Sequence, residues 1–154
     1  MMRWFLFSLI LLATACGKNT LVSDQWSSDE DSYWTSDDTV QIAINSQDSI
    51  TRYDLIVELD HTTEYPFSNL YIEVGNRTPA GDTLRTPVSL ELADRKGQWQ
   101  GECGGNSCTA TIPLRSRFYF QDQGEYQIWI LPYMRTDSIP AVQEVTLRLD
   151  RAEQ

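Results

Sequence analysis

Beyond residue 39, apolar and polar residues alternate with a period of two along most of the chain. This period predicts β-strands that bury one face and expose the other to water. A first such strand is expected at 40–44, and 53–60 shows the pattern clearly. From residue 53 onward, the alternation predicts a set of inward-facing positions in several strands. They are Tyr53, Leu55, Val57, Leu59, Leu70, Ile72, Val74, Leu84, Val88, Leu90, Leu92, Ala110, Ile112, Leu114, Tyr126, Ile128, Ile130, Val145, Leu147 and Leu149.

Turn-forming residues separate these segments, for example at 76–82, 94–97 and 122–124. No stretch carries the sustained apolar pattern of an amphipathic helix. The spacing therefore predicts an all-β fold, an antiparallel β-sandwich of about seven to nine strands, in a single domain over 39–154. A β-barrel is the alternative, because it produces the same alternation.

Residues 1–16 have the pattern of a bacterial lipoprotein signal. A basic residue precedes an apolar stretch at 4–12, and Ala13 and Ala15 lead into Cys16. The apolar stretch is about half the ~20 residues that a membrane-spanning helix needs. We expect residues 1–15 to be removed and Cys16 to be acylated, which would hold the protein on a membrane. The alternative is an ordinary secretory signal with an incidental cysteine.

Gly17 follows the cysteine, in place of the aspartate that retains many lipoproteins in an inner membrane. We therefore expect an outer-membrane lipid anchor with the body of the protein in the periplasm. Residues 16–38 are expected to form the lipidated N-terminus and an acidic tether, because 18–38 is rich in Ser, Asp and Glu and lacks periodicity. Within it, Trp26, Tyr33 and Trp34 are too apolar for a pure linker and are expected to pack on the edge of the domain.

The chain carries 12 Lys and Arg against 22 Asp and Glu, a balance that repels phosphate backbones and excludes nucleic acid as a partner.

Cys103 and Cys108 flank a Gly-Gly-Asn-Ser stretch, and in an exported protein we expect them to form a disulfide at a hairpin tip. No metal site is expected. The sole histidine, His61, is far from these cysteines, and the acidic tether lacks the order of a calcium-binding loop.

Catalytic patterns are missing from the sequence. One histidine allows only one His-based triad or dyad, and no serine lies in a Gly-x-Ser-x-Gly motif. His61 follows an alternating segment, and we expect it to be an exposed residue at a strand end. The residues therefore indicate no enzyme activity, and a small-molecule ligand is not expected.

Three apolar side chains leave a second function open. Trp99 lies near the expected hairpin tip, while Trp129 and Leu131 lie on the strand face opposite Ile128 and Ile130. They are expected either to be buried beneath the N-terminal segment or a second sheet, or to form an exposed aromatic platform. The platform would make the protein a carbohydrate-binding β-sandwich, which is the alternative function.

Two segments carry a resemblance to a known family. The first is Tyr-Pro-Phe-Ser-Asn-Leu-Tyr at 65–71, and the second contains Leu-Ala-Asp-x-x-Gly-x-Trp-x-Gly at 92–101. Together they resemble the GldH gliding-motility lipoproteins of Bacteroidetes, and the likeness continues in order over nearly the whole mature chain. The sequence departs from the family at 102–108, where a glycine-rich stretch is usual and the cysteine pair stands instead.

The resemblance implies a non-enzymatic envelope lipoprotein without a cofactor, which acts with proteins of the gliding machinery, whose parts overlap with the type IX secretion apparatus. Pro66 would fix the backbone before a strand, and Asp94 with Gly97 would make a turn that delivers Trp99. The family-motif residues are interpreted as architectural, with a partner-binding edge as the alternative. They are Tyr65, Pro66, Phe67, Ser68, Asn69, Asp94, Gly97, Trp99 and Gly101.

Four Asp-Ser/Thr-aliphatic tripeptides resemble the O-glycan acceptor sequence of exported Bacteroidetes proteins. Their hydroxyl residues are Thr39, Ser49, Thr83 and Ser138. We expect a glycan at one or more of them.

Overall fold

The computed structural model describes residues 19–29 and 33–153. Within these residues the regular secondary structure consists of strands. The strands are β1 (Thr20–Ser27), β2 (Trp34–Thr35), β3 (Val40–Ser46), β4 (Tyr53–Thr62), β5 (Asn69–Arg77), β6 (Thr83–Glu91), β7 (Glu102–Gly104), β8 (Ser107–Phe118), β9 (Gly124–Pro132), β10 (Ser138–Ile139) and β11 (Val142–Arg151). Among the described residues, no helix is long and apolar enough to cross a membrane.

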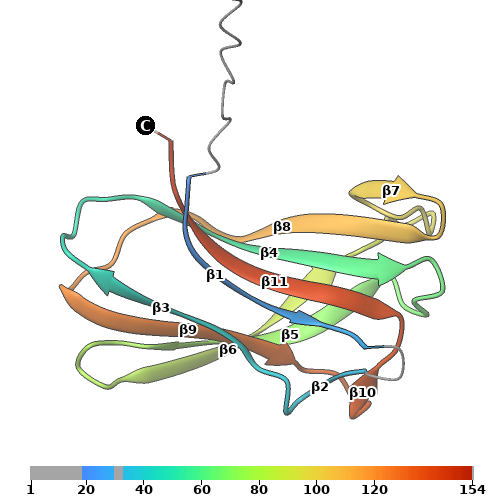
Figure 1. Ribbon diagram of the computed structural model, residues 1–154, viewed down its shortest axis with the longest axis horizontal. Helices are drawn as coiled ribbons and strands as arrows, with labels where there is room; N and C mark the ends of the chain where they lie inside the picture. The colour runs from blue at the N-terminus through green and yellow to red at the C-terminus, as the bar shows by residue number, and fades with distance from the viewer. Residues whose placement is uncertain (1–18, 30–32, 154) are drawn as a thin grey trace, which may run out of the picture.

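The strands form two layers of a β-sandwich (Figure 1). One sheet has five strands in the order β1-β11-β4-β8-β7, and the other has four in the order β3-β9-β5-β6. Every pairing is antiparallel, and β2 with β10 forms a small additional sheet. The predicted antiparallel sandwich is therefore confirmed. The β-barrel alternative is wrong, because neither sheet closes on itself.

The core lies between the two sheets and is built by the alternation seen in the sequence. In β4 the exposure alternates strictly between buried and half-buried residues, so that Leu55, Val57 and Leu59 all face inward. Leu147 and Leu149 of the neighbouring β11 are fully buried beside them. Burial of these side chains, at about 25 cal/mol per Å² of apolar surface, is what holds the two sheets together.

The predicted inward face is only partly correct on β6. Leu90 is buried, Val88 is half-buried, and Leu84 is 63% exposed. Leu84 lines an open cleft whose other lining residues come from both sheets. Burial therefore declines along the strand because the two sheets separate in that direction.

The segment before residue 39 differs from the expected tether. β1 pairs with β11 along its whole length, and the indole of Trp34 is fully buried. Trp34 Nε1 donates a hydrogen bond to the carbonyl of Asp38 at 2.9 Å, and Trp26 lies 6.3 Å from Trp34 between ring centroids. The two tryptophans do pack on the body, as expected, but Tyr33 is 54% exposed. The folded part of the chain thus starts at Thr20, well before the expected boundary.

The expected signal at residues 1–15 and the lipidation residue Cys16 lie outside the described residues. The last strand, β11, ends beside the start of β1 (Figure 1), where Arg151 N donates to the carbonyl of Asn19 at 2.9 Å. We call this the anchor end of the sandwich. The β3–β4 and β8–β9 connections lie at the same end, and the β4–β5 connection and β7 lie at the opposite one (Figure 1).

Candidate functional site

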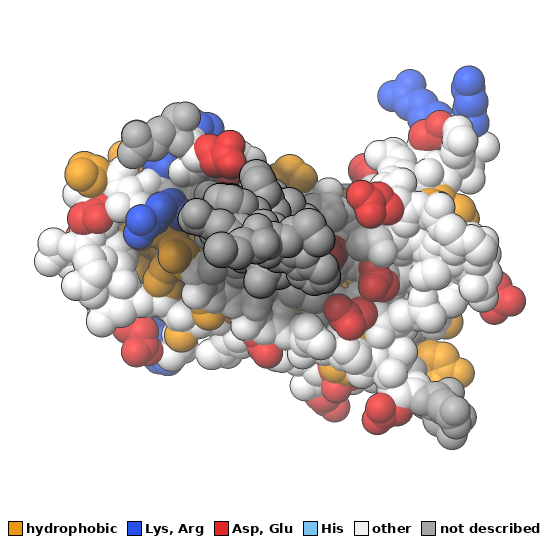
Figure 2. Space-filling view, turned by 45° about the horizontal axis from the view of Figure 1, so that its top comes forward, with side chains coloured by type: hydrophobic (Ala, Val, Ile, Leu, Met, Phe, Trp, Pro, Cys, Tyr) orange, Lys and Arg blue, Asp and Glu red, His pale blue; other side chains and the backbone are white. Residues whose placement is uncertain are grey.

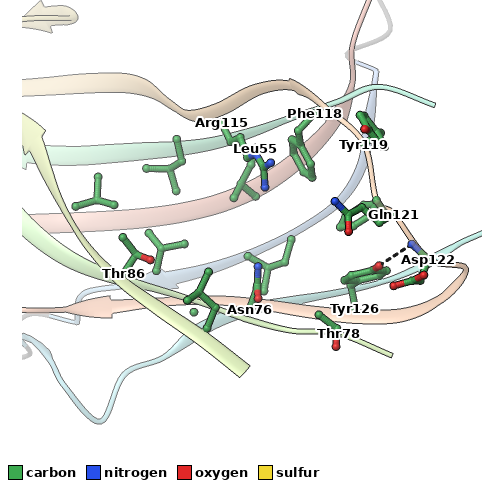
Figure 3. Close-up of a pocket in the computed structure, with 17 residues that line it drawn as sticks. Leu55, Asn76, Thr78, Thr86, Arg115, Phe118, Tyr119, Gln121, Asp122 and Tyr126 are labelled. Carbon is green, nitrogen blue, oxygen red and sulfur yellow. Dashed lines mark hydrogen bonds between the residues drawn. The ribbon is translucent and has the colours of Figure 1, made fainter. Parts of the chain in front are cut away.

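A cleft of about 400 Å³ opens between the two sheets at the edge formed by β6 and β8. Figure 3 shows side chains from both layers pointing into it. Leu55 and Phe118 come from the five-stranded sheet, and Asn76 and Tyr126 come from the four-stranded sheet. On the opposite edge of the sandwich, β1 and β3 are in contact and close the core. The cleft therefore results from splaying of one edge only.

The floor of the cleft toward the anchor end is aromatic. Phe120 lies 4.3 Å from Tyr126 and 5.2 Å from Phe118, measured between ring centroids. Arg115 stacks over Phe118 at 4.9 Å, and the hydroxyl of Tyr126 accepts a hydrogen bond from Asp122 N at 3.1 Å (Figure 3). These contacts fix the floor, so the cleft is a preformed apolar surface with a polar rim.

Both strands that border the cleft have unpaired edges. Among residues 19–29 and 33–153, β6 pairs only with β5, and β8 pairs with β7 only over residues 107–109. Pro87 of β6 and Pro113 of β8 lie on these two strands, and proline in a sheet is confined mainly to edges because it lacks a backbone donor. The two prolines are therefore a signal in the sequence for edge strands, which the alternation of apolar and polar residues does not contain.

The family-motif residues lie together at the opposite end of the sandwich. Ser68 accepts hydrogen bonds at its carbonyl from the backbone N–H groups of Leu92 and Ala93, both at 2.9 Å, which joins the two motif segments. Tyr65 is buried and its hydroxyl donates to the carbonyl of Asn69 at 3.1 Å. Burial also raises the pKa of the Tyr65 hydroxyl. These contacts favour the architectural interpretation of the motif.

The other family-motif residues around Tyr65 are mostly exposed, and Gly101 adopts a backbone conformation that favours glycine. Phe67 is 42% exposed and packs edge-on against Tyr65, while Pro66 and Ser68 are exposed. Asn69 Nδ2 donates to Ser89 Oγ at 2.9 Å, which ties the start of β5 to β6. Gly101 has a positive φ of 100°, and a side chain there would collide with the β8 backbone.

The turn at 94–97 forms as its residues predicted. The Asp94 carboxylate accepts hydrogen bonds from Lys96 N at 2.8 Å and Gln98 N at 2.9 Å, and Gly97 has a φ of 79°. The returning chain forms a bridge between Ala93 and Trp99. The turn therefore places the half-buried Trp99 ring against the sandwich.

His61 is fully buried, so the expectation of an exposed strand-end residue is wrong. It continues the inward-facing row of β4, and the rings of Trp99 and Tyr65 cover it at 4.6 Å and 5.8 Å. Its Nδ1 donates to the Thr62 carbonyl at 2.9 Å, and its Nε2 has no hydrogen-bond partner among the described residues. The histidine is thus a core residue beneath the family motif.

Trp129 lies flat on the outer face of the four-stranded sheet. A Cβ at Gly75 would overlap its indole, and the Arg85 guanidinium lies 5.6 Å from the ring centroid. Glycine at this position therefore leaves room for the ring. Trp129 and Leu131 are both half-buried, and Gly75 and Arg85 of the same sheet supply cover for the Trp129 ring.

Cys103 and Cys108 are joined by a disulfide across the β7–β8 hairpin, with their Cα atoms 4.1 Å apart. Within the described residues, no group of three or more His, Cys, Asp or Glu side chains could hold a metal ion. The candidate acceptor residues Thr39, Ser49, Thr83 and Ser138 are all exposed.

Comparison with known protein families decides the classification. The family model described as GldH lipoprotein matches residues 22–149. The chain belongs to the GldH lipoprotein family. The gliding motility lipoprotein GldH homolog of Christiangramia forsetii is 25% identical over 142 residues, covering 92% of this chain and 85% of the relative. The gliding motility lipoprotein GldH of Flavobacterium johnsoniae is 29% identical over 138 residues, covering 86% and 82%.

Two solved structures share a weak likeness to this GldH-family chain. Xyl-CBM35 in complex with a glucuronic acid-containing disaccharide has a TM-score of 0.37 and 13% identity, covering 91% of this chain and 96% of that one. CBM35 from Cellvibrio japonicus Abf62 has a TM-score of 0.36 and 13% identity, covering 90% and 94%. At these TM-scores neither structure assigns a ligand to this chain. Membership of the GldH family supports a membrane-anchored lipoprotein with a role in gliding motility.

Proposed function

We propose that this protein is an outer-membrane lipoprotein, anchored through Cys16 with its body in the periplasm, and that it is a non-enzymatic protein-interaction component of the gliding motility machinery. The family assignment supports the role in gliding, and the lipoprotein pattern at residues 1–16 supports the anchor. The partners would be other envelope proteins of gliding or of the associated type IX secretion apparatus.

The cleft between β6 and β8 is the proposed contact site. The observation that carries this proposal is Leu84, a core-facing residue that is 63% exposed beside an unpaired strand edge. An isolated protein gains nothing by exposing a leucine from its core face, whereas a partner that covers it would bury apolar surface.

The occupant is an extended segment of a partner protein. Such a segment can pair its backbone with β6 and place alternate apolar side chains over the aromatic floor of the cleft, which is the mode of β-strand addition. The net charge of −10 favours a segment that carries Lys or Arg beside its apolar residues. The backbone pairing would supply affinity, and the cleft would select the side chains.

The test is complementation of a deletion strain with the full-length variant Leu84→Arg. It places a charge in the cleft at an already exposed position, so we expect normal protein levels but loss of gliding and of crosslinks to envelope partners. The matched control is Tyr133→Arg, at a residue that is 55% exposed and outside the cleft lining. Normal gliding and unchanged crosslinking with Leu84→Arg would contradict the proposal.

The alternative of a carbohydrate-binding protein needs an aromatic ring with a free face. Trp129 packs on Gly75 and has the Arg85 guanidinium near its ring, and Trp99 packs against His61. Neither tryptophan is therefore free for stacking, and this alternative would have to use nearby tyrosines such as Tyr71 and Tyr133, which are 45% and 55% exposed. Binding of the purified protein to defined glycans on an array would favour it over a protein partner.

Glycosylation at Thr39, Ser49, Thr83 or Ser138 remains part of the proposal, since the side chains are accessible. Intact mass spectrometry of protein isolated from its host should show mass in addition to the polypeptide and lipid. Replacement of all four residues by alanine should remove that excess mass, and a native mass without it would end this part of the proposal.

A further inference from the structure

A compact surface at the anchor end combines exposed arginines with exposed apolar side chains. We call it the anchor-end patch and define it by Ile50, Arg52, Arg117, Tyr119 and Arg151. Ile50 is 81% exposed and Tyr119 is 44% exposed, and the Arg52 guanidinium lies 4.5 Å from the centre of the Tyr119 ring. Figure 2 shows basic and hydrophobic side chains next to each other on one part of this face.

The patch is continuous with the point where the chain enters the first strand. Two shallow depressions meet here and share Arg117, Arg151 and Glu153 in their linings. One of them also includes Asn19, and the other includes Ile50. The patch therefore begins at the first described residue of the chain.

Only three residues of chain length separate Asn19 from the proposed anchor at Cys16. A fully extended chain covers at most ~3.6 Å per residue, so this connection spans at most about 11 Å. Acyl chains on Cys16 would be inserted in the bilayer, which would keep Asn19 within roughly that distance of the lipid headgroups. A body held on so short a connection has to place its anchor end against the membrane.

We infer that the anchor-end patch is a membrane-contact surface, which binds phospholipid headgroups through Arg52, Arg117 and Arg151 and places Ile50 and Tyr119 at the interface. The inference rests on the lipid anchor of the proposed function. It adds a defined orientation, with the family-motif end directed away from the bilayer.

The arginines of the patch are available for phosphate groups. Among the described residues, none of the three forms a salt bridge with a carboxylate. Arg117 Nη1 donates to the Glu153 backbone carbonyl at 2.7 Å, which directs the side chain without neutralising it. Guanidinium groups bind phosphate in a bidentate manner and are well suited to headgroups.

Most nearby carboxylates are bound by the protein's own groups. Asp48 accepts hydrogen bonds from the N–H and hydroxyl of Thr51 and from Ile50 N, and these bonds lower its pKa, with a smaller contribution from the charge of Arg151. Asp54 accepts from Arg117 N at 2.7 Å. Asp150 accepts from a threonine hydroxyl of β1 and lies 3.7 Å from a guanidinium of its own strand, and Glu153 is exposed. The more exposed arginines can therefore reach a lipid surface ahead of these acids.

The apolar members have the chemistry of the interface. Tyrosine is enriched at the headgroup level of membranes, where its ring and hydroxyl meet different surroundings. Ile50 follows the Asp48 turn, whose hydrogen bonds hold the loop in one conformation. Such a loop can insert an aliphatic side chain without first losing much conformational freedom.

The test uses the full-length lipoprotein, acylated in its host and reconstituted into vesicles of phosphatidylcholine with phosphatidylglycerol. A polarity-sensitive fluorophore is attached at Ile50→Cys or, as the control, at Phe67→Cys, which is exposed at the opposite end. Nitroxide groups on the lipid headgroups quench a nearby fluorophore. We expect strong quenching at position 50 and little at position 67, and equal quenching at both positions would overturn the inference.

A charge variant tests the arginines. Each arginine near an anionic surface strengthens binding about fivefold. The double variant Arg52→Glu with Arg151→Glu should therefore lower the fraction of protein whose anchor end contacts the membrane by more than about tenfold, and quenching at position 50 should fall. The matched control, Arg95→Glu with Lys96→Glu at the opposite end, should leave the quenching at position 50 unchanged.

Flotation with the vesicles separates the membrane contact from the lipid anchor of the proposed function. Protein that floats without quenching at position 50 overturns only the membrane contact, whereas protein that does not float overturns the anchor as well.

Discussion

Replacement of Trp34 by alanine tests whether the acidic segment before residue 39 is part of the folded body. The indole is fully buried, its Nε1 donates to the Asp38 carbonyl, and its ring packs near Trp26. If this segment were only a tether, loss of the side chain would have little effect on stability. In the structure, the substitution removes a core side chain.

The magnitude follows from the buried area. A buried tryptophan removes about 200 Å² from water, and at about 25 cal/mol per Å² this corresponds to about 5 kcal/mol as an upper value. Measured Trp-to-Ala substitutions in cores cost about 3–5 kcal/mol. We therefore expect the free energy of unfolding to fall by about 4 kcal/mol, which lowers the melting temperature by about 10–15 °C for a domain of this size.

Urea denaturation followed by circular dichroism measures the change, with the full-length protein in detergent. The matched control is the neighbouring residue, Tyr33→Ala, because its side chain is 54% exposed and should change stability by less than about 0.5 kcal/mol. Equal and small effects of Trp34→Ala and Tyr33→Ala would refute the packing of this segment.

Three further substitutions test separate features of the fold. Gly75→Ala adds a Cβ that overlaps the Trp129 indole, so urea denaturation should show a loss of about 1–3 kcal/mol, and an unchanged midpoint would contradict the position of that ring. Tyr65→Phe removes the hydrogen bond to the Asn69 carbonyl and should cost about 1 kcal/mol. Burial raises the Tyr65 pKa above its ordinary value of 10.0, so the wild type should lose stability as the pH rises above that value, and the variant should lack this part of the loss. Cys103→Ser opens a disulfide between residues only five apart, so the free energy of unfolding should fall by about 2 kcal/mol or less. Complete unfolding of the variant would contradict this, because it would show that the disulfide stabilises the protein by more than its short loop implies.

The alternation of apolar and polar residues was sufficient to predict the central strands. In β4 and β11 both neighbours are strands of the same sheet, so burial depends on which face a residue occupies, and period two reports this directly. The same parity also places His61 inward, in line with Leu59. The expectation of an exposed histidine placed the end of the strand before His61, whereas β4 continues to Thr62 and keeps His61 on its inward face.

The first strand and the cleft were harder to predict for different reasons. β1 is an edge strand with polar residues at most positions, and only Val22 and Trp26 of its sequence pack against the core. The exposure of Leu84 depends on the separation of two sheets, a property of tertiary packing that the local pattern of β6 does not contain. The arginines of the anchor-end patch come from three separate segments, so their proximity follows only from the topology.

The pairing of β1 with β11 links the beginning of the folded body to its final strand, with Thr20 opposite Asp150. β11 lies between β1 and β4 in the sheet, so it supplies hydrogen bonds on both sides. During export the N-terminal strand emerges first and has no partner until almost the entire polypeptide has been translocated. If Cys16 is acylated as proposed, lipid attachment can take place on an unfolded substrate, and a polypeptide interrupted before residue 142 would leave the segment next to the lipid unpaired and open to proteolysis.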